Sequence, residues 1–600
     1  MKKRLKVLGV LVLVVVLVVS VMTGLSEGNA KGNVEKAEAA STTRNVNNVI
    51  QMPCDGLAYN SIGEYAVEES GTNLSSLTFP TVEETGEIDM EQIRTNVEEY
   101  LANYLEDTQV GRVFFNVNYT RSAVPSDVFD TFAYDVGMQE DGTVAEGTEK
   151  TLIEKPTQFK DVQYFWYALQ ENIDLIGMGI DYVNANDVEA WASFRMNDHH
   201  YPSDTLINAS FRYNYASTWG VNGSSAYMDY TVEAVQSCYL NYIKEVVTNY
   251  DELDGIELDF LRTAPYMSNE NKESMQILND FVKRIKTEIN EIRPNMKVAV
   301  RVYATEELNL GYGLDVAQWV ADGSVDVVTV ANFYMPTSFD LPIEAWRESI
   351  DARNTEKYDY VILAGLDWGV KSHPYYYLAM TPAHTRGFVS AAYANGADGT
   401  YLFNMFYLDG YFATEYKISE DGVLTSENIF KERMLASDSL ESAESGLRRY
   451  TYGYLSTFSD YWSTIPRKLA GYSSTAFKMQ TGTAPEEGYY MVTIGVDEAY
   501  TGYDANNLIV TLNGKPLKQI GDMPRSSDMP VVSTSSEYQA KHLTQVAQRF
   551  VQFVVTDLNE VQDGYNVINV INKSGKTQNI LWVEVFVDGT DGATPVIANQ

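Results

Sequence analysis

Residues 254–262, DGIELDFLR, constrain the fold more than any other segment of this chain. Side chains alternate between the two faces of a strand, so three apolar residues share one face here while Glu257 and Asp259 share the other. Burying a carboxylate costs several kcal/mol unless it is paired, hydrogen-bonded or hydrated. We therefore expect a buried strand that directs two acids into a polar cavity.

The same pattern recurs along the middle of the chain. Each candidate strand is apolar on one face and becomes polar on the other face only near its C-terminal end. Seven segments fit this description: residues 113–119, 189–197, 254–262, 297–303, 325–334, 359–368 and 400–406.

Helical patterns separate these strands. Residues 275–292, for example, carry apolar side chains at spacings of three and four, which indicates a helix with one buried face. Alternating strands and helices predict parallel strands joined by crossover helices. An open doubly wound sheet is the alternative, but its helices would bury both strand faces and leave no reason for the polar strand ends. We predict an α/β fold, a closed (β/α)8 barrel, with seven of its eight strands located.

In such a barrel the active site lies at the C-terminal ends of the strands. The polar and aromatic residues expected at this end are the candidate functional residues, besides Glu257 and Asp259: Arg195, Asn197, Asp198, His199, Arg301, Tyr303, Asn332, Tyr334, Asp367, Trp368 and Asn404. Each also has a structural alternative, such as an ion pair, a loop cap or a core position.

The N-terminus has the pattern of a secretory signal. Four basic residues within the first six precede an apolar run over residues 7–22, and cleavage after Ala39 fits the small-residue pattern there. An uncleaved membrane anchor is the alternative, because the run is long and the cleavage site distant. We expect residues 1–39 to direct the chain out of the cell, to a secreted or cell-surface location.

Changes in the sequence pattern divide the rest of the chain into segments. We predict a polar leader over 40–90, the barrel over 91–435, a connector over 436–480 and a β-sandwich over 481–600, because short alternating strands without helices begin near residue 488. We expect this sandwich to fold by itself, with sugar binding or support of the barrel as its role.

The composition of the chain limits the classes of substrate and partner that we expect it to bind. The formal net charge is −38, which disfavours nucleic acid and makes a neutral substrate the simpler expectation, although a local basic cleft would accept an anionic one. Two cysteines exclude a disulfide framework. The five histidines form no metal-binding motif, and residues 40–600 contain no GxSxG or Walker sequence, so we expect no metal or cofactor.

Four segments together resemble a known family. They are WASFRMNDH at 191–199, DGIELDFLR at 254–262, VRV at 300–302 and GADGTYLFN at 396–404. This combination resembles the bacterial glycosyl hydrolases described as family 10-like, over about half of the chain. The resemblance implies a TIM barrel, a secreted carbohydrate-active hydrolase and an accompanying sandwich. The acidic strand departs from the DxxDxDxE pattern of chitinase-like barrels, which argues against their chemistry.

Cleavage of a glycosidic bond needs two carboxyl groups, about 5–5.5 Å apart for retention and about 6.5–9.5 Å apart for inversion. Glu257 and Asp259, two positions apart on a strand, would have Cα atoms about 6.6–6.8 Å apart. Alternatively Asp259 acts with Asp198 or Asp367 from another strand. A structural ion pair with Arg195 or Arg301 is the other possibility, and it corresponds to a non-catalytic carbohydrate-binding protein that keeps the barrel as a scaffold.

Overall fold

The computed structural model places the chain from residue 44 onward in one compact unit. The structure describes residues 44–52, 56–58, 64–67, 74–156, 160–333, 339–367, 369–373, 376–405, 408, 413–418, 424–452, 465–497, 507–524 and 549–595. The predicted signal or anchor segment lies outside these residues.

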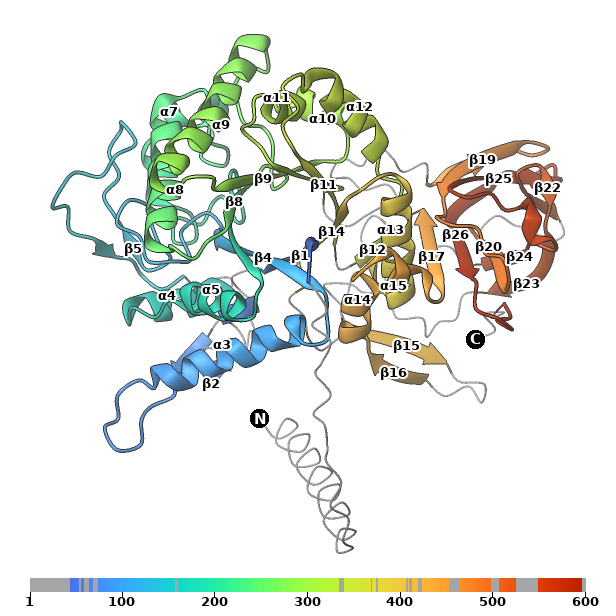
Figure 1. The fold of residues 1–600 in the computed structure, drawn as a ribbon, viewed down its shortest axis with the longest axis horizontal. Coiled ribbons are helices and arrows are strands. Elements are labelled where there is room, and N and C mark those ends of the chain that lie inside the picture. Colours follow the sequence, from blue (N-terminus) through green and yellow to red (C-terminus); the bar gives the residue numbers. More distant parts are fainter. Residues whose placement is uncertain are drawn as a thin grey trace, which may run out of the picture. The chain divides into compact units, whose positions relative to one another are not determined.

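Eight parallel strands close into a barrel, with helices around it (Figure 1). Around the barrel the strands follow the order β1-β14-β11-β10-β9-β8-β7-β4. Their bounds are β1 (Asn45–Met52), β4 (Val110–Asn118), β7 (Glu189–Arg195), β8 (Gly255–Asp259), β9 (Lys297–Tyr303), β10 (Val327–Ala331), β11 (Val361–Leu366) and β14 (Gly399–Leu402). The predicted (β/α)8 barrel is confirmed, and each of the seven predicted segments overlaps one of its strands.

The eighth strand is β1, which pairs with β14 on one side and β4 on the other. It lies inside the predicted polar leader, so the barrel begins well before residue 91 and that boundary is wrong. Its sequence, NVNNVIQM, is rich in amides, which hid it in the sequence. One of those amides has a partner far along the chain: the buried Asn48 donates from Nδ2 to Asp438 Oδ1 over 3.1 Å.

Each barrel strand is followed by at least one helix before the next barrel strand or, after β14, before the C-terminal sheets. The longest, α9, begins after Asn271, whose side chain accepts hydrogen bonds from two backbone N–H groups of the first turn. Its predicted apolar face is buried, including Phe281, Ile285 and Ile289. The helices are α3 (Met90–Leu105), α4 (Lys160–Gln170), α5 (Leu175–Ala185), α6 (Ser210–Asn214), α7 (Ala216–Trp219), α8 (Glu233–Asn249), α9 (Lys272–Ile292), α10 (Glu306–Gly311), α11 (Val316–Ala321), α12 (Ile343–Arg353), α13 (Pro382–Ala394), α14 (Phe430–Ala436) and α15 (Leu440–Glu444), with a 3₁₀ turn, η1, at Val221–Gly223.

Short antiparallel hairpins are inserted between these elements. They are formed by β2 (Glu64–Val67) with β3 (Leu74–Thr78), β5 (Tyr134–Asp135) with β6 (Thr151–Leu152), β12 (Gly369–His373) with β13 (Tyr376–Ala379), and β15 (Thr414–Ile418) with β16 (Leu424–Asn428).

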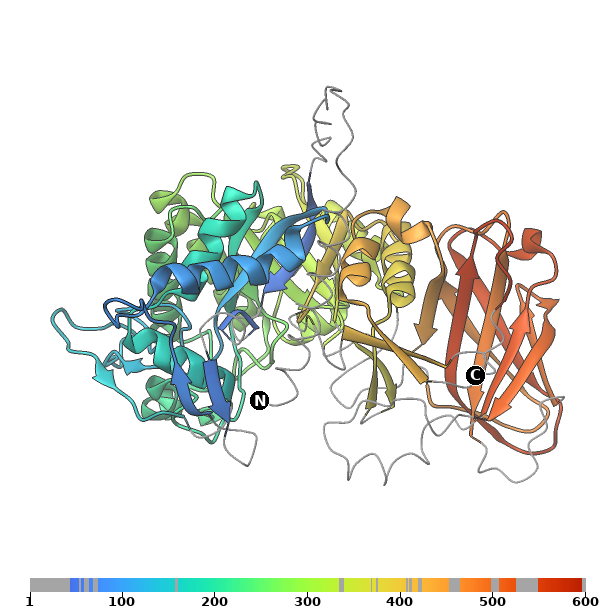
Figure 2. The same ribbon diagram turned by 90° about the horizontal axis from the view of Figure 1, so that it is seen from below.

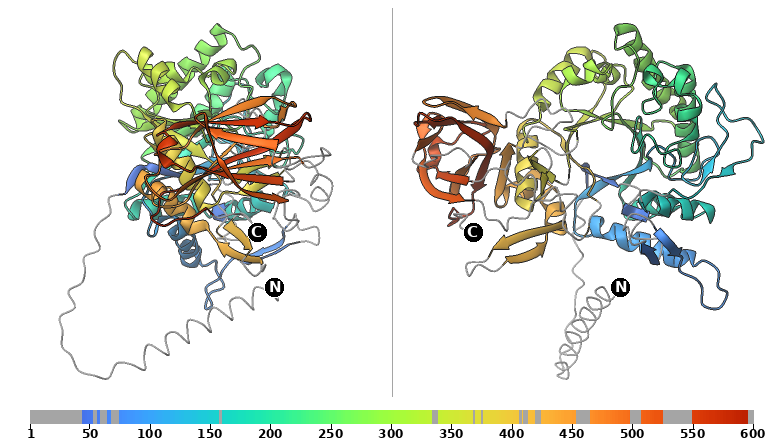
Figure 3. Two further views of the ribbon diagram at one scale, coloured as in Figure 1. Left: turned by 90° about the vertical axis from the view of Figure 1, so that its right-hand side faces the viewer. Right: turned by 180° about the vertical axis from the view of Figure 1, so that it is seen from behind.

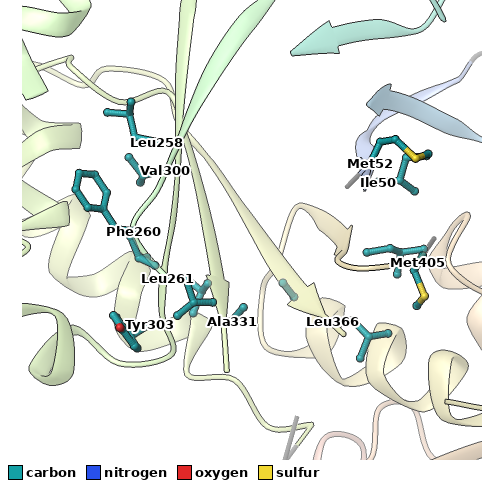
Figure 4. Packing of buried hydrophobic residues seen from close by; sticks show 14 of the residues in the cluster. Ile50, Met52, Leu258, Phe260, Leu261, Val300, Tyr303, Ala331, Leu366 and Met405 are labelled. Carbon is teal, nitrogen blue, oxygen red and sulfur yellow. The ribbon is translucent and has the colours of Figure 1, made fainter. Parts of the chain in front are cut away.

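The barrel is apolar in one layer of its interior and polar above it. A separate interior cluster includes Phe114 and Trp191, whose rings stack with centroids 5.0 Å apart. The other strand faces pack in the main core, where Leu258, Phe260 and Val300 lie beside β8 and β9 (Figure 4). Because Trp191 pairs with Gly255, the two acids of β8 fall in successive layers beyond this aromatic one, toward the C-terminal end.

Two antiparallel sheets follow the barrel and form the predicted sandwich (Figures 2 and 3). The larger sheet has the order β17-β26-β20-β24-β23, with β18 also paired to β26, and the smaller has the order β19-β25-β21-β22. The bounds are β17 (Arg448–Tyr452), β18 (Arg467–Leu469), β19 (Ser474–Gln480), β20 (Tyr489–Val496), β21 (Leu508–Leu512), β22 (Lys515–Pro516), β23 (Lys518–Pro524), β24 (Arg549–Val554), β25 (Tyr565–Asn572) and β26 (Gln578–Asp588), with a 3₁₀ turn, η5, at Leu558–Glu560.

Three of these strands, β17 to β19, lie within the predicted connector, so residues 436–480 contribute to both sheets. The sequence boundary is therefore too late. Its cause is that β17 and β18 are short and separated in sequence, while the pairing of each with β26 arises only in the fold.

A buried carboxylate joins the sandwich to α13. Glu584 of β26 accepts hydrogen bonds from His384 Nε2 at 3.0 Å, from Arg449 at 3.0 Å by two nitrogens, and from Thr451 Oγ1 at 2.9 Å. The ring of His384 is oriented by Thr381, the N-cap of α13, through a reciprocal capping pair. Glu584 thus links α13 to the sandwich through buried hydrogen bonds.

No helix in the described part of the chain is both long and apolar enough to span a bilayer. Within the same residues, no group of three or more His, Cys, Asp or Glu side chains is arranged to hold a metal ion. Cys238 is a buried free thiol.

Candidate active site

Asp259 forms a two-pronged ion pair in the barrel interior. Its oxygens accept from Arg301 Nε at 3.1 Å and Arg301 Nη2 at 2.9 Å, and the backbone N–H of Leu261 adds a third bond at 3.0 Å. The pair follows from register, because Asp259 on β8 lies directly opposite Arg301 on β9. Only 1% of the Asp259 surface and 3% of the Arg301 surface is exposed, so this carboxylate is committed to the guanidinium.

Glu257 lies one layer deeper and is fully buried. Its Oε1 accepts from Ser193 Oγ at 2.7 Å and from Tyr401 Oη at 2.9 Å, while Oε2 has no hydrogen-bond partner. Burial, reinforced by the negative charge of Asp259, raises the pKa of Glu257 to about 8. This side chain is therefore a protonated carboxylic acid at neutral pH.

Asp198 is the centre of a second ionic cluster, just beyond β7. Its Oδ2 accepts from Arg195 Nη1 at 2.8 Å and lies 3.4 Å from Arg262 Nε, and its Oδ1 contacts the His200 ring. Burial alone would raise the pKa of Asp198, but the charges of His200, Arg262 and Arg195 outweigh it and hold that pKa well below its usual range. Asp198 is thus an ionised partner of arginines, not a proton donor.

Asn197 and His199, on either side of Asp198, have different environments. Asn197 is fully buried, donates from Nδ2 to Pro265 O at 2.7 Å and accepts from Met228 N at 2.9 Å, so its amide holds loop backbone together. The His199 ring is half-buried beside Tyr227, with centroids 5.2 Å apart, and burial lowers its pKa.

A small pocket lies at the C-terminal ends of β9, β10, β11 and β14. Three of the predicted residues, Arg301, Asn332 and Asp367, meet here; the full lining is Arg301, Ala331, Asn332, Gly365, Leu366, Asp367, Tyr401 and Phe403. Ala331 and Leu366 are labelled in Figure 4. The absence of a side chain at Gly365 matters, since a Cβ there would lie 2.5 Å from that of Ala331.

Tyr401 and Phe403 were not among the residues predicted from the sequence. Both lie on the interior face of β14 or just after it, and Phe403 packs under the guanidinium of Arg301, with 3.7 Å from Cζ to the ring centroid. Their alternation in GTYLFN was the available signal, because two aromatics two positions apart share a strand face. Tyr401 connects the pocket to the buried Glu257.

The other candidates are placed less centrally. Tyr303 is buried, and its hydroxyl accepts from Ala264 N at 3.1 Å, which positions the loop after β8. Asn404 is half-buried with a left-handed backbone, φ 56°. Tyr334 and Trp368 lie outside the described residues, and their predicted roles remain predictions.

No family model matches the chain, and neither does any curated protein. Among solved structures, similarity is found to the endo-1,4-beta-mannanase from Rhizomucor miehei, with 13% identity over 57% of this chain and 89% of that one and a TM-score of 0.33. The alpha-L-fucosidase isoenzyme 1 from Paenibacillus thiaminolyticus shows 12% identity over 87% and 95%, with a TM-score of 0.30. The catalytic domain of GH30 xylanase C from Talaromyces cellulolyticus shows 11% over 86% and 98%, with a TM-score of 0.33.

None of these three is described as family 10-like, so that resemblance stays a prediction. Identities and TM-scores at this level are low. The barrel is therefore established by the strand pairing of this chain, and its activity has to be argued from the pocket.

Proposed function

We propose that the chain is a glycoside hydrolase that acts at the pocket between β9 and β14. One observation carries the proposal: a carboxyl group, an amide, a phenol and an aromatic ring, from Asp367, Asn332, Tyr401 and Phe403, line one depression at the C-terminal end of the barrel. Polar groups that exchange hydrogen bonds with hydroxyls, beside a flat apolar ring, suit a sugar.

Asp367 is the only one of the four predicted acids that lines the pocket, and we assign it the role of nucleophile or base. Glu257 supplies the proton, since its carboxyl group is protonated at neutral pH and hydrogen-bonded to Tyr401. In this scheme the Tyr401 hydroxyl turns from Glu257 Oε1 to give its proton to the leaving oxygen, and the protonated Glu257 carboxyl turns to donate its own proton to the Tyr401 oxygen, so that Tyr401 ends neutral and Glu257 ends as the carboxylate. Asp259 holds Arg301 in the pocket wall and does not contact substrate.

The experiment is a screen of the purified chain against plant, host and microbial glycans for released reducing sugars, followed by variants. We expect Asp367→Asn and Tyr401→Phe each to lower kcat by about 10²–10⁴-fold, the usual contribution of acid–base catalysis, with an unchanged melting temperature. Asp280→Asn, an exposed acid on α9, is the matched control. Full activity of Asp367→Asn would contradict the assignment.

A non-catalytic carbohydrate-binding protein is the second candidate, favoured by the ion pairs that hold Asp198 and Asp259. It predicts glycan binding by calorimetry without any released sugar, and no effect of Asp367→Asn beyond affinity.

We further propose that residues 1–39 export the chain from a bacterial cell, either as a cleaved signal or as an anchor. Fractionation of cells that express the chain with and without these residues tests this: export requires the segment, and retention in the membrane fraction identifies the anchor.

A further inference from the structure

Four arginines gather at the mouth of the barrel in a chain whose formal net charge is −38. Arg195 ends β7, Arg262 follows β8, Arg301 lies on β9, and Arg212 on α6 donates to the backbone oxygen of Asp198. In the described part of the chain, the carboxylates near them are those of Asp198 and Asp259, which pair with Arg195 and Arg301, and that of Asp367, which lines the pocket with Arg301. Glu257, below them, is protonated at neutral pH. Among the described residues at the mouth, the four arginines outnumber the three carboxylates.

The arginines differ in how well they are paired. Arg301 makes both bonds of a two-pronged pair, and Arg195 makes a direct bond to Asp198. Arg262 has no comparable partner: its Nε lies 3.4 Å from Asp198 Oδ2 without forming a hydrogen bond, and its Nη2 contacts only the ring nitrogens of His200, at 3.3 and 3.5 Å. In the described part of the chain, Arg262 donates to no carboxylate or carbonyl oxygen.

Arg262 is also largely buried. Its side chain is 12% exposed, so water satisfies few of its five donors. Burial and the charges of Arg195 and Arg301 both destabilise its cationic form, lowering its pKa, whereas Asp198 and Asp259 act in the opposite sense. A bound anion would remove this penalty.

The position of Arg262 relates it to the pocket. Its guanidinium lies 5.9 Å from the centroid of the Phe403 ring, and Phe403 lines the pocket. Arg301 contacts the same ring at 3.7 Å. Arg262 does not line the pocket itself, but its guanidinium approaches a ring that does, and the planar fork of arginine matches a carboxylate.

We infer that the pocket selects a glycan that carries a carboxylate, an acidic sugar, and that Arg262 binds that carboxylate. The inference rests on the proposed function and makes its substrate class more specific. It replaces the neutral substrate that the net charge of the chain favours, because at physiological ionic strength a surface charge is screened over about 8 Å while a contact at the mouth is not.

Binding to the full chain, measured by calorimetry, tests the inference independently of hydrolysis. The probes are oligosaccharides of galacturonic acid, of glucuronic acid and with terminal sialic acid, each with its carboxyl-reduced neutral counterpart, and one sulfated oligosaccharide. We expect at least one carboxylated probe to bind about 10-fold or more tightly than its reduced counterpart. Raising NaCl from 50 to 500 mM should weaken the binding of that probe and leave the affinity for its reduced counterpart unchanged.

The matched variants are Arg262→Gln and, as control, Arg94→Gln, which removes an exposed arginine on α3 that pairs with Asp181. Arg262→Gln should bring the carboxylated probe to the affinity of its reduced counterpart, and Arg94→Gln should keep the preference. The inference is overturned if no carboxylated probe is preferred, if the preference survives Arg262→Gln, or if only the sulfated probe binds.

The two proposals fail separately. Release of sugar from neutral glycans without a carboxylate preference refutes this inference and leaves the hydrolase standing. Binding of a carboxylated probe that depends on Arg262, with no sugar released from any glycan, supports the inference and refutes hydrolysis.

Discussion

Asp259→Asn separates the two roles that the barrel allows for this carboxylate. The amide keeps the shape of the side chain and one acceptor oxygen, so the bond from Leu261 N can persist. It removes the negative charge that faces Arg301, whose surface is only 3% exposed. The variant therefore leaves a buried cation without its counter-charge.

The size of the effect follows from that burial. Breaking a buried ion pair by removing one partner costs about 3–5 kcal/mol. With an unfolding entropy of about 2.1 cal/mol/K per residue, a cooperative unit of about 350 residues has roughly 0.7 kcal/mol/K, so the melting temperature should fall by roughly 4–7 °C.

The assay is a double-variant cycle on the full chain, with thermal and urea unfolding of Asp259→Asn, Arg301→Met and the combined variant. We expect the combined variant to be less destabilised than the sum of the two single ones, because it leaves no unpaired charge. Asp280→Asn on α9 again controls for the loss of an acid elsewhere.

A different outcome would refute this reasoning. If Asp259→Asn unfolds within a degree of the unmodified chain and also loses all hydrolysis, Asp259 is a catalytic carboxylate and its pair with Arg301 contributes little to stability. The sequence analysis expected that role, and the geometry of the pair argues against it.

Glu257→Gln should abolish a pH dependence of the free energy of unfolding. Because the pKa of Glu257 is raised from 4.5 to about 8, its contribution to stability is present below pH 4.5 and is lost as the pH rises to 8. The loss amounts to about 5 kcal/mol in all. Urea unfolding from pH 4 to 9 checks this, and an unchanged slope in the variant would contradict it. Residues 481–600 alone should be unfolded by circular dichroism, since they lack β17, β18 and β19, whereas 445–600 should be folded; a folded shorter fragment would restore the sequence-based expectation. Glu584→Gln should lower the free energy of unfolding by about 3 kcal/mol or more, because His384 and Arg449 lose their shared anion, and a change within error in urea unfolding would show that this contact is not a structural one.

The sequence predicted the barrel well because the signal is local. In each of seven strands, apolar alternation and polar C-terminal ends lie within ten residues, and in α9 the apolar period is visible in a single segment. The strand β1 was missed for the opposite reason: its amides read as a polar segment, and the partner of the buried Asn48 is Asp438, almost 400 residues later.

The sequence predicted several residues of the site, but not which of them pair with one another. Arg301 and Asp259 both stood out, and their ion pair was one of two alternatives, since the lateral register of β8 against β9 cannot be deduced from either strand alone. Tyr401 was overlooked because its importance comes from its hydrogen bond to Glu257. The strand of Glu257, β8, lies across the barrel from β14, which carries Tyr401. Its own strand resembles any buried strand with an aromatic residue.

The closure of the barrel by β1 and β14 has a consequence for how the chain is made. Asn48 pairs with Thr400, so the first strand emerges from the ribosome long before its partner exists. At about 5–20 residues per second, the interval is roughly 18–70 s, during which β1 has one unpaired edge. Folding of the barrel is therefore a late event in translation, and a chain that is exported before residue 400 is complete crosses the membrane with its barrel still open.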